Sequence, residues 1–280
     1  MSSPSVESSP ELDLAAAPAP AQEPPPPASR RYQPVTTWTP LWGFGAAVLV
    51  MAIVLSFLGA GVLAIALSSS KAIDTGGAAF RLHFDQPGFA YAFGAMMLAS
   101  QALGIWLTVL FARVGGGRTR DVLALRAPFG GNTAYFWAIP GFVVFGFAVG
   151  ALVQWLSPQS SQADTAIMVE LTRSPAWWMI FLVAVVFAPL QEELMFRGFL
   201  FSALARSRRL GLIGATLLTS ISWAAIHGYS PQGNATIFAL GLALSFVLWR
   251  TGSTRVTMLC HGSYNALAFI AAAYIPPAGG

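Results

Sequence analysis

The sequence predicts an all-α protein, a polytopic bundle of about seven transmembrane helices with a cytoplasmic N-terminus. Three observations support this fold class. First, 55% of the 280 residues are hydrophobic and 9% are charged, against about 25% charged in an average soluble domain. Second, the mean hydropathy is +0.63. Third, long apolar runs alternate with short arginine clusters. These features exclude a soluble globular enzyme and predict an integral membrane protein.

Residues 1–40 form a separate segment by composition. They contain 10 of the 19 prolines, together with many Ser and Ala residues. Such a segment buries too little apolar surface to offset the entropy cost of ordering. We therefore predict a disordered Pro/Ala/Ser-rich tail over 1–40, followed by a membrane domain over 41–275.

Seven apolar runs follow the tail. A transmembrane helix needs about 20 residues, and the runs are near that length, although the sixth is short and charged residues interrupt the fourth. The sequence predicts spans at 41–67, 88–112, 134–157, 176–204, 210–227, 234–249 and 256–275.

The arginines of the loops indicate how these spans are oriented. Alternate loops carry 11 of the 15 basic residues, and cytoplasmic loops are the ones enriched in Lys and Arg. We therefore expect the N-terminus in the cytoplasm, the C-terminus outside, and a bacterial inner (plasma) membrane location with membrane lipid as a partner. Because this topology explains the net charge of +4, no nucleic-acid partner is expected.

The fourth run contains three ionisable residues, Glu192, Glu193 and Arg197. Each costs at least ~2.5 kcal/mol at membrane depth on insertion scales, so each needs a partner or a water-filled cavity. Glu193 and Arg197 are four residues apart with the acid first, which favours an ion pair. Glu192 points about 100° away from Glu193 on a helix and is expected to face a cavity. Taken alone, this segment fits a general base and a purely structural clamp equally well.

Two further groups of polar residues in apolar runs favour a catalytic role over a structural clamp. Trp223 and His227 end the fifth run four residues apart, and His261 and Asn265 open the seventh with the same spacing, which places each pair on one helix face. Together with Glu192 they supply a base and several hydrogen-bond donors from separate helices. This set suits amide hydrolysis, in which Glu192 takes a proton from water while imidazole and carboxamide groups stabilise the oxyanion.

The order and spacing of these motifs resemble the CAAX protease and bacteriocin-processing family (CPBP, also called the type II CAAX prenyl endopeptidase or ABI family). The resemblance rests on Glu192-Glu193-x-x-x-Arg197, an aromatic-x-x-x-His at Trp223 and His227, and His261-x-x-x-Asn265. It covers a catalytic core over 175–275. The family usually has Phe where this chain has Trp223, a change that keeps the aromatic wall.

The resemblance implies an intramembrane endopeptidase, a hydrolase, with a conical cavity open toward the cytoplasm. Glu192 would activate water with help from His227, and His261 with Asn265 would form the oxyanion hole. The supporting residues would be Glu193, Arg197 and Trp223. A protein or peptide, cleaved near its C-terminus or at a processing site, would reach the cavity from the cytoplasmic side or laterally.

Members of this family are often named metalloproteases. Glu192, His227 and His261 could form a His₂Glu zinc site with an open position, so a divalent metal such as zinc is the alternative cofactor. The sequence lacks HExxH, and a glutamate–water mechanism also explains Asn265, a poor zinc ligand. A mechanism without a cofactor is therefore favoured.

A non-catalytic membrane module, either a transporter or a peptide-binding or immunity partner, is the alternative function. The intact set Glu192, His227, His261 and Asn265 favours the enzyme, and no internal repeat supports a transporter built from inverted halves.

The sequence places the three motifs at different depths below the cytoplasmic surface, although one site requires them at the same depth. At the helical rise of ~1.5 Å per residue, Glu192 lies about 21 Å from Arg206, whereas His261 lies only about 9 Å from Arg255. His227 also lies far from the cytoplasmic side on which the cavity is expected to open.

Overall fold

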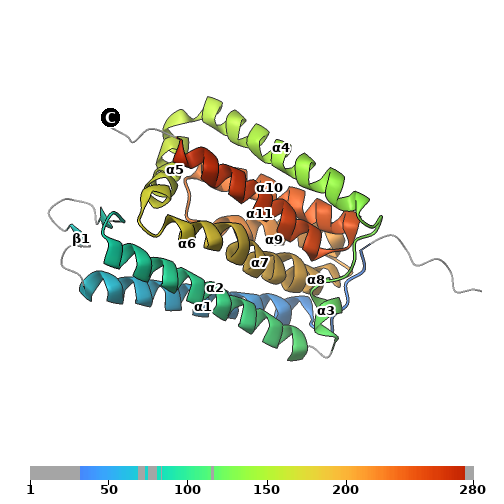
Figure 1. Cartoon of the computed structure of the whole chain (residues 1–280). Helices are drawn as coiled ribbons and strands as arrows, with labels where there is room; N and C mark the ends of the chain where they lie inside the picture. Colours follow the sequence, from blue (N-terminus) through green and yellow to red (C-terminus); the bar gives the residue numbers. More distant parts are fainter. Residues whose placement is uncertain (1–31, 69–72, 75–80, 83, 115–116, 275–280) are drawn as a thin grey trace, which may run out of the picture. The chain divides into compact units, whose positions relative to one another are not determined.

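Six long apolar helices make up most of the described part of the chain (Figure 1). The computed structural model describes residues 32–68, 73–74, 81–82, 84–114 and 117–274. The long helices are α1 (Pro40–Ser68), α2 (Pro87–Val114), α4 (Thr133–Leu156), the continuous stretch Trp177–Ala205, α10 (Pro231–Thr251) and α11 (Thr254–Ala273). The predicted polytopic helical bundle is confirmed. The fifth predicted span forms the shorter α9 (Gly211–Ala225).

Shorter elements connect these helices. They are a two-stranded antiparallel ladder of β1 (Ile73–Asp74) with β2 (Arg81–Leu82), α3 (Thr119–Val122) and α5 (Pro158–Arg173). Prolines begin α1, α2, α5 and α10, since a residue in the first helical turn needs no N–H partner. Gly252, with φ of 66°, ends α10 in the left-handed conformation that glycine adopts without strain.

The fourth predicted span is one helical stretch with two π segments. It consists of α6 (Trp177–Leu182), η1 (Val183–Phe187), α7 (Ala188–Glu192), η2 (Glu193–Leu200) and α8 (Phe201–Ala205). Pro189 has no N–H, so the carbonyls of Ala184 and Val185, five and four residues earlier, lose their helical donor. This explains why regular α-helical hydrogen bonding fails before Pro189. Short π segments are frequent at functional sites.

This stretch is also the centre of the bundle. It packs against α1, α2, α9, α10 and α11, and every residue from Glu193 to Leu204 is buried. Its second half carries the large apolar side chains Phe196, Phe199 and Phe201, which offset the cost of placing Glu193 and Arg197 in the same environment.

The end of the predicted tail packs on this core. Tyr32 is buried, and its hydroxyl lies 2.6 Å from Ser202 Oγ. Burial raises the pKa of Tyr32 to about 12. Trp38 Nε1 donates to the Phe111 carbonyl at 3.1 Å. The aromatic rings therefore order the chain from Tyr32 onward, short of the predicted boundary at residue 40, and residues 1–31 of the tail lie outside the described residues.

The helices define two ends of the bundle. We call one the arginine-rich end, because the described loops and helix termini there carry nine arginines: Arg113, Arg118, Arg120, Arg126, Arg206, Arg208, Arg209, Arg250 and Arg255. The other, the α5 end, carries α5, the β1–β2 ladder and the 226–230 connection between α9 and α10. Helix α5 joins α4 to α6 there and contacts α10 and α11.

A buried segment at the arginine-rich end reconciles the depths of the motifs. Thr254 Oγ1 donates to the Leu123 carbonyl at 2.7 Å and Thr254 N to the Ala124 carbonyl at 3.1 Å. Gly198 packs on the same segment, because a Cβ there would lie 3.1 Å from the Leu123 oxygen. Helix α11 therefore begins inside the bundle, level with Gly198, which brings His261 to the level of Glu193.

Candidate active site

A cavity of about 380 Å³ lies among α4, α5, α7, α10 and α11. Its lining includes the four predicted catalytic residues Glu192, His227, His261 and Asn265, and also Trp223. The supporting residues Glu193 and Arg197 lie behind this wall, with side chains 0% exposed. Three motifs far apart in the sequence thus meet at one cavity.

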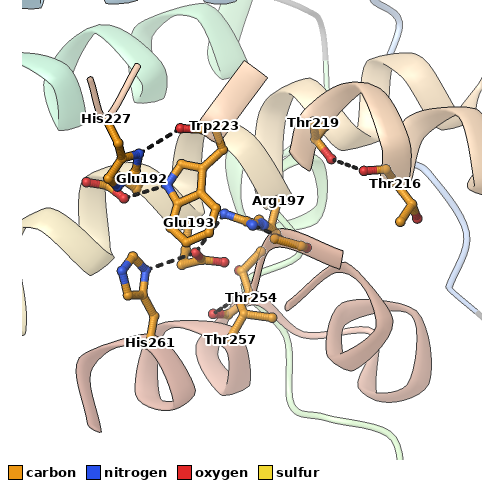
Figure 2. Close-up of polar contacts among 11 residues, drawn as sticks. Glu192, Glu193, Arg197, Thr216, Thr219, Trp223, His227, Thr254, Thr257 and His261 are labelled. Atoms are coloured by element: carbon orange, nitrogen blue, oxygen red, sulfur yellow. Dashed lines mark hydrogen bonds and ion pairs between the residues drawn. The ribbon is translucent and has the colours of Figure 1, made fainter. Parts of the chain in front are cut away.

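Glu193, Arg197 and His261 form a buried ionic cluster (Figure 2). Arg197 Nη1 donates to Glu193 Oε1 at 3.0 Å, so the ion pair expected from the spacing is present. His261 Nδ1 lies 3.2 Å from the same oxygen, and Arg197 Nη2 donates to the Gly241 carbonyl at 3.3 Å. An unpaired charge in this interior would be strongly destabilising. The cluster therefore fixes η2 against α10 and α11.

Glu192 has a different environment, although it is the adjacent residue. Its side chain is half-buried and lines the cavity. Trp223 Nε1 donates to Glu192 Oε2 at 2.6 Å (Figure 2). A hydrogen bond to a charged acceptor is stronger than a neutral one, so the indole orients this carboxylate.

The two histidines each use one ring nitrogen to hold their position. His227 Nδ1 lies 2.7 Å from the Trp223 carbonyl. Because a carbonyl only accepts, Nδ1 carries the hydrogen, and Nε2 of a neutral ring has a free lone pair. The same reasoning applies to His261 Nδ1 against the Glu193 carboxylate. Both rings meet Trp223 edge to face, with centroids at 5.0 Å for His227 and 5.3 Å for His261.

Asn265 is positioned by the π segment η1. Its Nδ2 donates to the Ala184 carbonyl at 2.9 Å, one of the two carbonyls that Pro189 deprives of a donor. A carboxamide nitrogen has two N–H groups, so this bond leaves a second donor on Asn265 beside the cavity.

Sequence reasoning missed further polar residues of the cavity, among them Asp164, Tyr229 and Tyr264. The carboxylate of Asp164 accepts from Ser230 N at 2.8 Å and Ser230 Oγ at 2.6 Å, which ties α5 to the start of α10. Burial raises the pKa of Tyr229, so its phenol remains a neutral donor. Asp164 lies far from the three motifs in the sequence, whereas Tyr229 follows His227 by two residues and Tyr264 directly precedes Asn265, so the positions of the two tyrosines offered a signal.

The zinc alternative concerns Glu192, His227 and His261. Among the residues that the structure describes, no three His, Cys, Asp or Glu side chains come together as a metal site. His261 Nδ1 faces Glu193 and His227 Nδ1 faces a carbonyl, while Glu192 is held by Trp223. Both histidines make these bonds through Nδ1, so the Nε2 atom of each ring stays free.

Comparison with known proteins identifies one family. The family model described as type II CAAX prenyl endopeptidase Rce1-like matches residues 174–267, a segment that contains all three motifs. Neither a curated protein nor a solved structure matches the chain. Together with the apolar helices, the match supports an integral membrane protein that is similar, over residues 174–267, to a family of proteases. The match over residues 174–267 supports membership of the type II CAAX prenyl endopeptidase (CPBP) family.

Proposed function

We propose that this protein is an intramembrane endopeptidase in which Glu192 activates a water molecule to hydrolyse a peptide bond. One observation carries the proposal: Glu192 of α7, His227 of the connection after α9, and His261 and Asn265 of α11 line a single cavity inside the bundle. The family match supports a hydrolase in general terms, and the residue roles are our inference.

In the first step, Glu192 removes a proton from water as the water oxygen attacks the carbonyl carbon of the scissile bond. Trp223 holds one oxygen of the carboxylate, which leaves the other free to accept the proton. The free Nε2 of His227 can accept the second hydrogen of the water and so orient it. A general base of this kind contributes about 10²–10⁴-fold to the rate.

In the second step, the negative charge that develops on the carbonyl oxygen is stabilised by two donors. These are the second N–H of Asn265 and Nε2–H of His261. Because His261 Nδ1 already donates to Glu193, donation from Nε2 requires that this nitrogen also carries a hydrogen. Donors placed where charge develops contribute about 3–4 kcal/mol each in well-studied hydrolases.

In the third step, the tetrahedral intermediate collapses. The proton held by Glu192 passes to the amide nitrogen, the C–N bond breaks, and a carboxylic acid and an amine leave as products. Atoms and charge balance with water as the only co-reactant. The proposal thus needs no cofactor.

The zinc alternative is tested directly by chelation. Purified protein in detergent, assayed with and without a strong zinc chelator, is expected to retain its activity. Loss of activity that added zinc restores would contradict the mechanism without a cofactor and favour a metal on Glu192, His227 and His261.

We further propose a bacterial inner (plasma) membrane location and a protein or peptide substrate. Apolar cavity residues such as Phe142, Phe147 and Leu240 suit the apolar side chains of a membrane-embedded substrate that arrives laterally. The exposed apolar side chains along α1, α2 and α4 suit contact with lipid.

The proposed function is tested by mapping peptide termini in membrane proteomes of cells that carry the wild type or Glu192→Gln. Glu170→Gln is the matched control, since it removes an exposed carboxylate of α5 that does not line the cavity. We expect uncleaved precursors to accumulate with Glu192→Gln alone. Identical termini in all three strains, at equal protein levels, would favour the non-catalytic membrane module.

A further inference from the structure

The cavity reaches the surface at the α5 end of the bundle. Its lining includes Asp164 and Thr165 of α5, Gly233 in the first turn of α10, and Ala271 near the end of α11. Thr165 and Ala271 are exposed. The rim of the cavity is therefore formed by the helix ends that meet at α5.

The cavity does not extend to the arginine-rich end. Among the described lining residues, those of α10 stop at Leu240, those of α11 start at His261, and none of the Trp177–Ala205 stretch lies beyond Glu192. Below this level the side chains from Glu193 to Leu204 fill the interior. At the first turn of α11, Thr254 donates to the carbonyls of Leu123 and Ala124, so this segment packs against the start of the helix. The cavity therefore stops within the bundle, at the level of Glu192 and His261.

The charges of the two ends are unequal. The nine arginines of the arginine-rich end face one acid in the described loops, Asp121. At the α5 end the acids Asp74, Asp85, Asp164 and Glu170 outnumber the basic residues Arg81 and Arg173 among the described residues. Cytoplasmic loops are enriched in Lys and Arg. The arginine-rich end is therefore assigned to the cytoplasm.

We propose that the cavity opens on the extracytoplasmic side, and that its substrates are membrane-anchored proteins or peptides whose scissile bond lies at or just inside that surface. The inference rests on the proposed function and specifies its substrate class. It differs from the cytoplasmic opening that the family resemblance implies. It also accounts for His227, which follows the last turn of α9 at the α5 end and is remote from the cytoplasmic surface.

The orientation is tested by cysteine accessibility in intact bacterial cells. Cys260 is buried and is replaced by Ser to give a cysteine-free protein. Thr165→Cys marks the rim of the cavity, and Ala127→Cys marks an exposed site of the arginine-rich end. Each protein is treated with a membrane-impermeant maleimide before and after lysis, and labelling is measured on the purified protein.

We expect Thr165→Cys to be labelled in intact cells and Ala127→Cys only after lysis. The reverse pattern, labelling of both sites in intact cells, or labelling of neither before lysis would each overturn the inference. Labelling does not depend on catalysis, so the same labelling pattern is expected when each cysteine variant also carries Glu192→Gln. A failed orientation is then distinguishable from a failed hydrolase assignment, which the terminal-peptide comparison decides separately.

Discussion

At the scale of single residues, Trp223 connects the two halves of the site. Trp223 is 1% exposed, and its Nε1 donates to Glu192. The guanidinium carbon of Arg197 lies over its ring, 4.4 Å from the ring centroid. A Phe, usual for the family at this position, would keep the ring but lose the N–H donor. The indole is therefore a positioning residue for Glu192 in this chain.

Trp223→Phe is expected to lower kcat about three- to tenfold with little change in KM, because the carboxylate loses one hydrogen bond of about 1.5–3 kcal/mol while water can partly replace it. Trp223→Ala is expected to unfold the protein more readily, since truncating a buried Trp costs about 3–5 kcal/mol. Rates and melting temperatures in detergent separate the two effects. Equal rates for the wild type and Trp223→Phe would remove the positioning role.

The adjacent carboxylates are expected to respond differently to the same substitution. Glu193→Gln leaves the buried Arg197 without its counter-charge, and breaking such a pair costs about 3–5 kcal/mol. Glu192→Gln leaves every buried charge paired and should keep the melting temperature near that of the wild type. Thermal unfolding of both purified variants tests this. A similar loss of stability in both would show that Glu192 is structural.

Spacing on one helix was sufficient to predict the Glu193–Arg197 pair, because residues four apart meet on one face. The bond between Trp223 and Glu192 could not be predicted, because it joins two helices whose rotation depends on the whole packing. Asp164 was missed for the same reason, since its partner Ser230 is 66 residues away.

At the scale of elements, the hydropathy of the sequence predicts the long helices but not the π segments or α5. A π segment depends on which carbonyls lose their donors, here through Pro189, and on a neighbour such as Asn265 that replaces them. Helix α5 is too polar to be recognised as a span, and its place over the cavity depends on contacts with α10 and α11. Hydropathy carries no information about such contacts.

Gly262 tests the contact between α11 and η1. A Cβ at this position would lie 2.6 Å from the Val185 carbonyl oxygen, so Gly262→Ala must push the helices apart. We expect a stability loss of about 1–3 kcal/mol, typical of overpacking, together with reduced activity as Asn265 moves from Ala184. Gly45→Ala is the matched control, because a Cβ there meets nothing within 4 Å. Equal melting temperatures for the two variants would contradict the close packing.

At the scale of the whole molecule, the segment matched by the family model and helices outside it together form the wall of the cavity. The family match covers 174–267, yet Phe142 and Phe147 of α4 also line the cavity. The sequence predicted the charge asymmetry of the loops but not where the cavity opens. That required the buried segment around Leu123, whose packing under α11 is a tertiary contact between distant residues.

The most direct test of the central claim is the cleavage rate of the purified, lipid-reconstituted protein on a precursor identified in the membrane proteome. The wild type and Glu170→Gln are expected to cleave this precursor at equal rates. Glu192→Gln should be slower by about 10²–10⁴-fold, the contribution of a general base, while it remains folded. A Glu192→Gln rate within a few fold of the wild type would contradict the account.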